Sequence, residues 1–145
     1  DNNTINLKKD KDFKLPKKLI FELNDTPDLA QTISVTCFGL GIACDLYGLK
    51  TLKIKETDRL KALKNELEKL GAKVNITNQS FHLKERKKFN SNVIIDTYDD
   101  HRMAMAFTPL ALLKPIIINN PKVISKSFPS FWTTLSKLCF EVSEY

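Results

Sequence analysis

The sequence predicts a mixed α/β (α+β) fold made of repeated βαβαββ units, with buried helices and outward-facing sheets. Two observations predict this arrangement. The segments expected to be the first and third helices, 28–42 and 101–107, are apolar nearly all round, whereas several expected strands alternate apolar and polar residues. A helix that is apolar on all sides is buried, and an alternating strand keeps one face in water. A doubly wound nucleotide-binding fold would show the opposite pattern, because its sheet is the buried layer.

Two helices are expected in the first half of the chain. Thr26 is a suitable N-cap and Pro27 a suitable first residue for a helix that runs to Ile42. A second helix should start near Thr57, with leucines on one face and charges on the other. It should stop at Gly71, because glycine readily adopts the left-handed conformation that ends a helix.

Two further helices are expected in the second half. One follows Asp99 and Asp100 and should end or kink at Pro109, because proline lacks the backbone N–H that continues a helix. The other should begin at Pro129. It is expected to bury Phe131, Leu135 and Leu138.

Six strands are expected between the helices. They cover residues 18–23, 50–54, 73–77, 80–84, 92–96 and 115–119. Within 50–54, for example, Leu52 and Ile54 alternate with Thr51 and Lys53, a pattern typical of a strand with one wet face. The resulting order is βαβαββ followed by βαβα, which indicates a repeat.

Charged residues recur with a similar offset in the two parts of the chain. Asp28 and Asp100 stand at the starts of the two apolar helices, 72 residues apart, and Lys55 and Lys126 precede the next helix in each part, 71 residues apart. Such an offset indicates two copies of one supersecondary unit. The expected units cover residues 17–90 and 91–145, after a polar lead-in at 1–16 that would be the tail of a preceding unit.

Composition favours a soluble globular domain, because 42% of the 145 residues are hydrophobic and 28% are charged. The chain contains no run of about 18 apolar residues, the length needed to span a membrane. Its first residues also lack the apolar stretch of a secretory signal. Cys37, Cys44 and Cys139 have apolar neighbours and no metal-ligand spacing. Buried reduced thiols in a cytoplasmic protein are therefore expected.

The net charge of +6 leaves several classes of partner open. Much of the excess lies in two short lysine-rich runs, 8–18 and 84–88. A solvated surface explains both runs, although nucleic acid, anionic lipid or a small anionic substrate would also suit them. Charge alone therefore does not choose among these partners.

Charged residues also gather at the predicted helix starts, where free N–H groups and the helix dipole favour a carboxylate or phosphate. If the units pack side by side, these starts can share one rim. The cations there would be Lys55, Arg59, Arg102 and Lys126, and the carboxylates Asp28 and Glu56. Local ion pairs on a solvated surface would explain each motif alone, but the common placement at four helix starts favours a shared anion site.

Four motifs occur in order along the chain: Thr26-Pro27-Asp28, Lys55-Glu56-Thr57-Asp58-Arg59-Leu60, Asp100-His101-Arg102-Met103-Ala104-Met105 and Lys126-Ser127-Phe128-Pro129. In order and spacing they resemble the signatures of the 5-enolpyruvylshikimate-3-phosphate synthase family. The resemblance extends from about Leu19 to Phe140. It implies the enolpyruvyl transferase fold, in which two similar domains of three βαβαββ units enclose the substrates, and it identifies this chain as part of the C-terminal domain.

The resemblance also implies an activity. The family transfers the enolpyruvyl (carboxyvinyl) group of phosphoenolpyruvate to the 5-hydroxyl of shikimate 3-phosphate and releases phosphate, in the shikimate pathway to chorismate and the aromatic amino acids. It implies a cytoplasmic enzyme that uses no metal and no organic cofactor. It also implies that neither nucleic acid nor a membrane is a partner. The missing N-terminal domain would carry the rest of the site, so this chain alone is expected to be an inactive half-site.

Individual roles follow from the resemblance at the matching positions. Asp28 resembles the carboxylate that contacts the ring hydroxyls of shikimate 3-phosphate and accepts the proton of the 5-hydroxyl. Glu56 resembles the acid that handles the proton at the methylene carbon of phosphoenolpyruvate, and Lys55 resembles a ligand near the shikimate hydroxyl.

The remaining cations resemble a clamp on the phosphate and carboxylate of phosphoenolpyruvate. They are Arg59, Arg102 and Lys126. His101 is expected only to support the residues that touch substrate. Some members of the family have an asparagine that contacts shikimate 3-phosphate five residues before the motif glutamate, where this chain has Thr51, so that contact is not assigned.

Two alternatives remain open from the sequence. A non-catalytic basic module could bind RNA or DNA through the lysine-rich runs, with an affinity that falls steeply with salt. A regulatory or orphaned fragment could keep the fold and lose the reaction. The complete set of charged motif residues argues against such decay.

Overall fold

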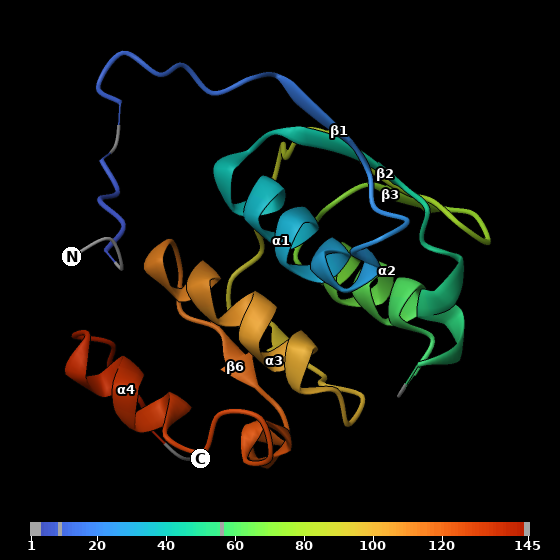
Figure 1. Cartoon of the computed structure of the whole chain (residues 1–145). Coiled ribbons are helices and arrows are strands. Elements are labelled where there is room, and N and C mark those ends of the chain that lie inside the picture. Colours follow the sequence, from blue (N-terminus) through green and yellow to red (C-terminus); the bar gives the residue numbers. More distant parts are fainter. Residues whose placement is uncertain (1–3, 9, 56, 144–145) are drawn as a thin grey trace.

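The computed structural model describes residues 4–8, 10–55 and 57–143 and contains two successive sets of strands and helices (Figure 1). The first set comprises β1 (Lys18–Glu22), the 3-10 helix η1 (Pro27–Leu29), α1 (Ala30–Leu40), β2 (Ala43–Tyr47), the 3-10 helix η2 (Lys50–Ile54), α2 (Arg59–Lys69), β3 (Val74–Ile76) and β4 (Phe81–Leu83). The second comprises β5 (Ile94–Ile95), α3 (His101–Phe107), the 3-10 helix η3 (Thr108–Leu112), β6 (Ile117–Ile118), the 3-10 helix η4 (Pro121–Ile124) and α4 (Phe131–Lys137).

The strands form two separate sheets. The larger sheet has the order β1-β2-β4-β3, in which β1 and β2 are parallel and the other pairs are antiparallel. The smaller sheet is the parallel pair β5-β6. Each parallel pair is connected through a helix, α1 in one case and α3 in the other, which confirms the repeated strand–helix–strand order.

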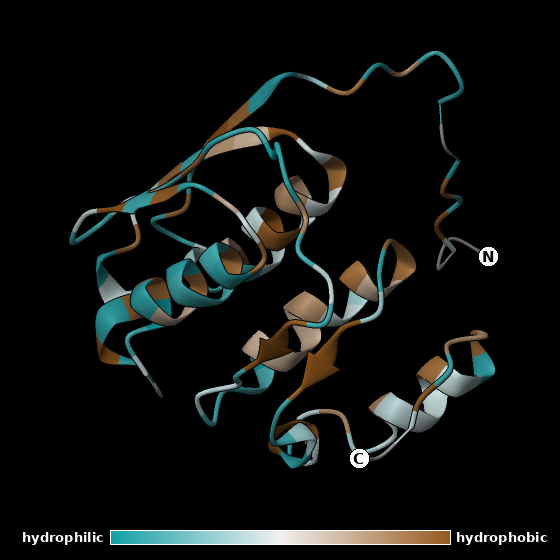
Figure 2. Cartoon of the chain, turned by 180° about the vertical axis from the view of Figure 1, so that it is seen from behind, coloured by the Kyte–Doolittle hydropathy of each residue, from teal (hydrophilic) through white to brown (hydrophobic). Residues whose placement is uncertain are grey.

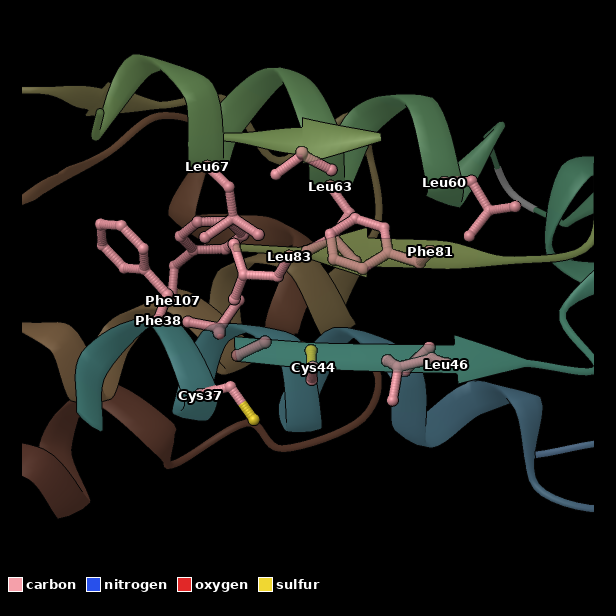
Figure 3. Close-up of a cluster of buried hydrophobic side chains, with 14 of the residues drawn as sticks. Cys37, Phe38, Cys44, Leu46, Leu60, Leu63, Leu67, Phe81, Leu83 and Phe107 are labelled. Carbon is pink, nitrogen blue, oxygen red and sulfur yellow. The ribbon is translucent and has the colours of Figure 1, made fainter. Parts of the chain in front are cut away.

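Helices α1, α2 and α3 lie between these sheets, as the sequence predicts for the buried helices. Helix α1 contacts β2 on one side and α2 and α3 on the others, and the smaller sheet lies beside α3 in both views (Figures 1 and 2). Phe38 of α1 and Phe107 of α3 are fully buried. Figure 3 shows leucines of α2 facing Phe81 and Leu83 of β4 in the same core.

The outer faces of the two sheets differ. In β2, Leu46 points into the core, while Asp45 lies on the outer side and bonds His82 of β4. The smaller sheet, whose strands are hydrophobic in Figure 2, instead has the paired residues Ile94 and Ile117 exposed. Its outer face is therefore apolar, unlike that of the larger sheet.

Two of the sequence predictions in the first unit are wrong. The first helix ends at Leu40 rather than Ile42, because Gly41 adopts a left-handed conformation with φ of 77° and its N–H caps α1. The strand expected at 50–54 is the 3-10 helix η2. The second strand of the unit is β2 instead, which begins two residues after Gly41.

The predicted starts of the next two helices are confirmed to within a residue or two. Asp58 caps α2 by accepting a hydrogen bond from the backbone N–H of Lys61. Helix α2 ends just before Gly71, whose φ of 98° requires glycine. Asp100 caps α3, which gives way to η3 before Pro109.

The prediction that α4 is buried is wrong. Phe131 and Leu135 are only partly covered and Leu138 is 64% exposed. The helix starts at Phe131 rather than Pro129 and lies at the edge of the fold, away from α1 and α2 (Figure 1). No second layer covers it within the described part of the chain. Cys139 beyond it is exposed, whereas Cys37 and Cys44 are buried as expected.

The described residues before β1 contain no helix or strand and run along the outside of the fold (Figure 1). The unit boundaries at 17–90 and 91–145 stay predictions. None of the helices that the structure describes combines the length and the apolar character needed to cross a membrane.

Candidate active site

Arg59, the first residue of α2, is a buried cation held between two carboxylates. Its side chain is only 2% exposed. Its Nη1 donates to Oδ1 of Asp28 at 2.8 Å, and its Nε donates to Oδ2 of Asp100 at 2.6 Å. A third and longer hydrogen bond joins Nη2 to Oδ1 of Asp100 at 3.4 Å. A buried charge is costly without partners, and these contacts compensate it.

Asp28 in η1 is the point where three cations meet. Besides Arg59, it faces Nζ of Lys55 at 3.7 Å and Nη2 of Arg102 at 3.3 Å. Nη1 of Arg102 also donates to the backbone carbonyl of Asp28 at 3.4 Å. Residues that are far apart in the sequence therefore share one cluster, which confirms that the starts of the first three helical segments lie together.

Local structure explains how these side chains converge. Pro27 opens η1 and so fixes the backbone next to Asp28. Lys55 caps the end of η2, just before α2, and Arg102 lies in the first turn of α3. The three elements therefore bring the side chains of Asp28, Lys55 and Arg102 together.

The cluster ranges from fully buried to accessible. Asp100 is 0% exposed, Asp28 is 35% exposed, and Lys55 and Arg102 are each 37% exposed. Among the described side chains, three cations therefore meet two carboxylates, and two of the cations remain in reach of solvent. Such an arrangement can bind an anion such as a phosphate or carboxylate, for which Arg supplies a bidentate fork.

Two of the predicted site residues are not placed in this cluster. Glu56 lies outside the described residues. Lys126 is exposed in the turn between η4 and α4, and in the described part of the chain no hydrogen bond or ion pair joins it to the Asp28 cluster. Their membership of the site stays a prediction.

His101 lies beside the cluster, whereas no contact joins Thr51 to it in the described part of the chain. His101 is partly exposed, and its Nδ1 is 4.0 Å from Oδ1 of Asp100, a contact that is ionic only when the imidazole is protonated. Thr51 is an exposed residue of η2. Among the described residues, no group of three or more His, Cys, Asp or Glu side chains could hold a metal ion.

The sequence did not predict that Asp100 contacts Arg59. The sequence identifies it only as the residue that opens α3, and it does cap that helix by accepting from the N–H of Arg102 at 2.9 Å. The structure adds the contacts to Arg59 and a hydrogen bond from Nε2 of Gln31 at 3.2 Å. The sequence signal is Gln31, the one amide side chain in α1.

A second charged cluster ties the other end of α2 to the second unit. Glu66 is 0% exposed and accepts hydrogen bonds from Nζ of Lys69 at 2.8 Å, the hydroxyl of Tyr98 at 2.8 Å and the backbone N–H of Asp96 at 3.0 Å. Burial opposes the charge of Lys69, but its hydrogen bonds to Asp96 and Glu66 outweigh burial and raise its pKa. Hydrogen bonds from Asn119 and Lys69 hold the pKa of Asp96 below its ordinary value.

A third polar group lies on the outer face of the larger sheet. It lines a shallow hollow of about 430 Å³, where Asp45 pairs with Lys18 and with Nδ1 of His82 at 2.9 Å. Burial raises the pKa of Asp45, but the hydrogen bonds from Lys18 and His82 outweigh it and lower the pKa overall. None of the predicted site residues lines this hollow.

Comparison with known proteins identifies the family. The sequence model described as EPSP synthase (3-phosphoshikimate 1-carboxyvinyltransferase) matches residues 2–135 of the chain. The chain belongs to the EPSP synthase family.

Curated relatives agree with this assignment. The chain is 48% identical over 121 residues to the 3-phosphoshikimate 1-carboxyvinyltransferase of Bacteroides fragilis (strain YCH46), a match that covers 81% of this chain and 30% of that protein. It is 42% identical over 118 residues to the protein of the same name from Neisseria meningitidis serogroup C, covering 81% of this chain and 27% of that protein. The chain therefore spans less than a third of the length of these relatives.

The fold agrees as well. An EPSP synthase structure from Acinetobacter baumannii superposes with a TM-score of 0.67 at 23% identity, over 74% of this chain and 26% of that one. The mixed α/β arrangement predicted from the sequence is therefore the fold of an EPSP synthase segment. Neither the family nor these relatives are described as nucleic-acid-binding proteins, so the alternative of an RNA- or DNA-binding module gains no support.

Proposed function

We propose that this chain is the C-terminal part of an EPSP synthase. The complete enzyme, in which a second domain is joined to this chain, would transfer the enolpyruvyl group of phosphoenolpyruvate to the 5-hydroxyl of shikimate 3-phosphate and release phosphate. The observation that carries the proposal is the cluster of Lys55, Arg59 and Arg102 around Asp28. These residues come from three of the four motifs that resemble the family.

The charges of the cluster suit the substrates. Phosphoenolpyruvate carries a phosphate and a carboxylate, and guanidinium groups bind both with paired hydrogen bonds. We assign Arg59 and Arg102 to this anion, together with Lys126, and we assign Lys55 to the shikimate hydroxyl. Asp28 accepts a hydrogen bond from Nη1 of Arg59, so a bound anion would share or take over part of this contact.

The reaction also needs three proton transfers. In the addition, one proton leaves the attacking hydroxyl and another reaches the methylene carbon of phosphoenolpyruvate; the same carbon then loses a proton when phosphate departs and the double bond re-forms. Asp28 is accessible beside the cations and is assigned to accept the proton of the hydroxyl, and Glu56 is assigned to handle the proton at the methylene carbon. Two carboxylates in different surroundings can divide acid and base roles in this way.

The site in this chain is open on one side, which indicates a half-site. Opposite charges 4 Å apart attract with about 1 kcal/mol in water and with about 4 kcal/mol at the effective dielectric constant near a protein surface. A second domain that closes over Asp28 would exclude water and align the two substrates. The proposal includes a cytoplasmic enzyme that needs no metal or organic cofactor, and the buried free thiols of Cys37 and Cys44 suit that location.

The test is phosphate release measured on the complete enzyme and on the purified chain. The complete enzyme should release phosphate from phosphoenolpyruvate only when shikimate 3-phosphate is also present. The chain alone should fold with a cooperative unfolding transition but show no turnover. Turnover by the chain within a hundredfold of the complete enzyme would reject the half-site, and a complete enzyme that releases no phosphate would reject the function.

A further inference from the structure

We propose that Asp100 is a positioning residue, whose buried carboxylate fixes the guanidinium of Arg59 in the orientation in which it binds an anionic substrate group. The inference rests on the proposed function, in which Arg59 binds phosphoenolpyruvate. In this role Asp100 touches no substrate and acts through Arg59, in addition to capping α3.

The contacts hold one edge of the guanidinium. Nε and Nη2 of Arg59 face the two oxygens of Asp100, at 2.6 and 3.4 Å. Nη1, on the other side, donates to Asp28, which is 35% exposed. Because the guanidinium is planar and rigid, holding the first edge sets the direction in which Nη1 points. That direction is toward the accessible part of the cluster.

The backbone before Asp100 adopts a conformation that is unfavourable for its residues. Tyr98 and Asp99 have φ of 54° and 55°, the left-handed region that side chains other than glycine rarely enter. Their side chains anchor the turn, Tyr98 by donating to Glu66 at 2.8 Å and Asp99 by accepting from Nδ2 of Asn120 at 2.9 Å. Such strain persists only where the surroundings enforce it, and here it carries Asp100 into the interior.

Gln31 supports the same carboxylate. It is 1% exposed, and its Nε2 donates to Oδ2 of Asp100 at 3.2 Å. Its Oε1 has no hydrogen-bond partner among the described residues. Turning the amide over would place this oxygen against the carboxylate, so Asp100 dictates the amide orientation even though a buried acceptor stays unpaired.

The first experiment is proton exchange of the Arg59 Nε–H, measured by NMR on the 145-residue chain. Asp100→Asn keeps the size and the helix cap but replaces one acceptor oxygen with an amide that cannot accept. We expect exchange of the Arg59 Nε–H to accelerate at least tenfold in this variant. The matched control is Asp58→Asn, which changes the N-cap of α2 and should leave that exchange rate within about twofold of wild type.

The second experiment measures kinetics in the complete enzyme. Asp100→Asn should raise the KM for phosphoenolpyruvate roughly 10- to 100-fold, the equivalent of one charge-assisted hydrogen bond, and leave the KM for shikimate 3-phosphate within about twofold. Because Asp100 acts through Arg59, adding Asp100→Asn to Arg59→Lys should worsen the KM for phosphoenolpyruvate less than threefold. Full multiplication of the two single effects would overturn the inference.

The outcomes separate this inference from the proposed function. If the wild-type enzyme is active and Asp100→Asn leaves the KM for phosphoenolpyruvate unchanged, the positioning role alone is rejected. If the wild-type enzyme is inactive, the proposed function fails, and the NMR result still decides whether Asp100 holds Arg59. If Asp100→Asn does not fold, the wild-type chain still decides the question by comparing the Nε–H exchange rates of Arg59 and the partly exposed Arg102. Equal rates would reject the inference, and a much slower rate for Arg59 would support it.

Discussion

The two ends of α2 are tied to the second unit by similar contacts, yet they differ in charge balance. At the start, buried Arg59 is held by Asp100 and Asp28. At the other end, buried Glu66 is held by Lys69 and by groups of the segment that follows β5. Both contacts join α2 to the second unit through a buried charge.

The difference lies in what remains accessible. At the start, Lys55 and Arg102 are each 37% exposed, and among the described side chains the cations outnumber the carboxylates by three to two. At the other end, one cation, Lys69, faces the two carboxylates of Glu66 and Asp96. A buried ion pair by itself is therefore weak evidence for a binding site. Cationic side chains within reach of solvent, such as Lys55 and Arg102, are the stronger sign.

The internal repeat contributes directly to the site. Asp28 and Asp100 occupy corresponding helix starts in the two units, and both contact Arg59. Their surroundings have diverged, because Asp28 is 35% exposed and Asp100 is 0% exposed. One copy of the repeated carboxylate is therefore accessible to solvent, and the other is buried against Arg59.

The largest effect is expected from Asp28→Asn in the complete enzyme. If Asp28 accepts the proton of the attacking hydroxyl, kcat should fall roughly 10²- to 10⁴-fold with a much smaller change in KM. Glu56→Gln should show the same pattern, because Glu56 is assigned to the proton at the methylene carbon. Steady-state phosphate release measures kcat for both variants. The matched control is Asp96→Asn, at the opposite end of α2, with kcat within about threefold of wild type. A near-normal kcat for Asp28→Asn would remove Asp28 from the catalytic residues.

An intermediate effect is expected on stability from Glu66→Gln. The amide cannot accept all three hydrogen bonds that the carboxylate accepts, so a buried donor loses its partner. The free energy of unfolding should fall by about 1–3 kcal/mol, measured by urea denaturation of the chain. Glu68→Gln changes an exposed carboxylate of the same helix and should cost less than about 0.5 kcal/mol. Equal losses of unfolding free energy in the two variants would show that the buried contacts of Glu66 do not contribute to stability.

The smallest effect is expected from Asp96→Asn, and it depends on pH. The lowered pKa of Asp96 in the folded state means that its stabilisation is present above the unfolded value of about 3.9 and is lost as pH falls through the folded pKa. Because the side chain is 45% exposed, water and salt screen the contribution to less than about 1 kcal/mol. Urea denaturation at neutral pH and near pH 3 should show a larger difference between wild type and variant at neutral pH. A larger difference at the lower pH would contradict this assignment.

Much of the fold could be predicted from the sequence because helix caps are local signals. Asp100 and Gly71 mark helix ends in the structure as in the sequence. The strand β2 was missed because its apolar residues follow α1 with only Gly41 as a break. The exposure of α4 could not be predicted, because the sequence pattern shows which residues are apolar and not what covers them.

The site could be predicted in part for a similar reason. Motif positions place Lys55, Arg59 and Arg102 at helix starts, and the repeat suggests that these starts share one rim. The contact between Arg59 and Asp100 spans 41 residues and depends on how α2 packs against the segment before α3. No local pattern carries that information, so the supporting role of Asp100 becomes visible only in three dimensions.

The most direct test of the account is an NMR titration of the chain with phosphoenolpyruvate at two salt concentrations. We expect the side-chain signals of Arg59 and Arg102 to shift, with weak binding that salt weakens further. The signals of Lys69 and of the backbone near Glu66 should stay unchanged. Shifts centred on the end of α2 or on the lysine-rich run 84–88, without any at Arg59 and Arg102, would contradict the claim that the start of α2 is the substrate site.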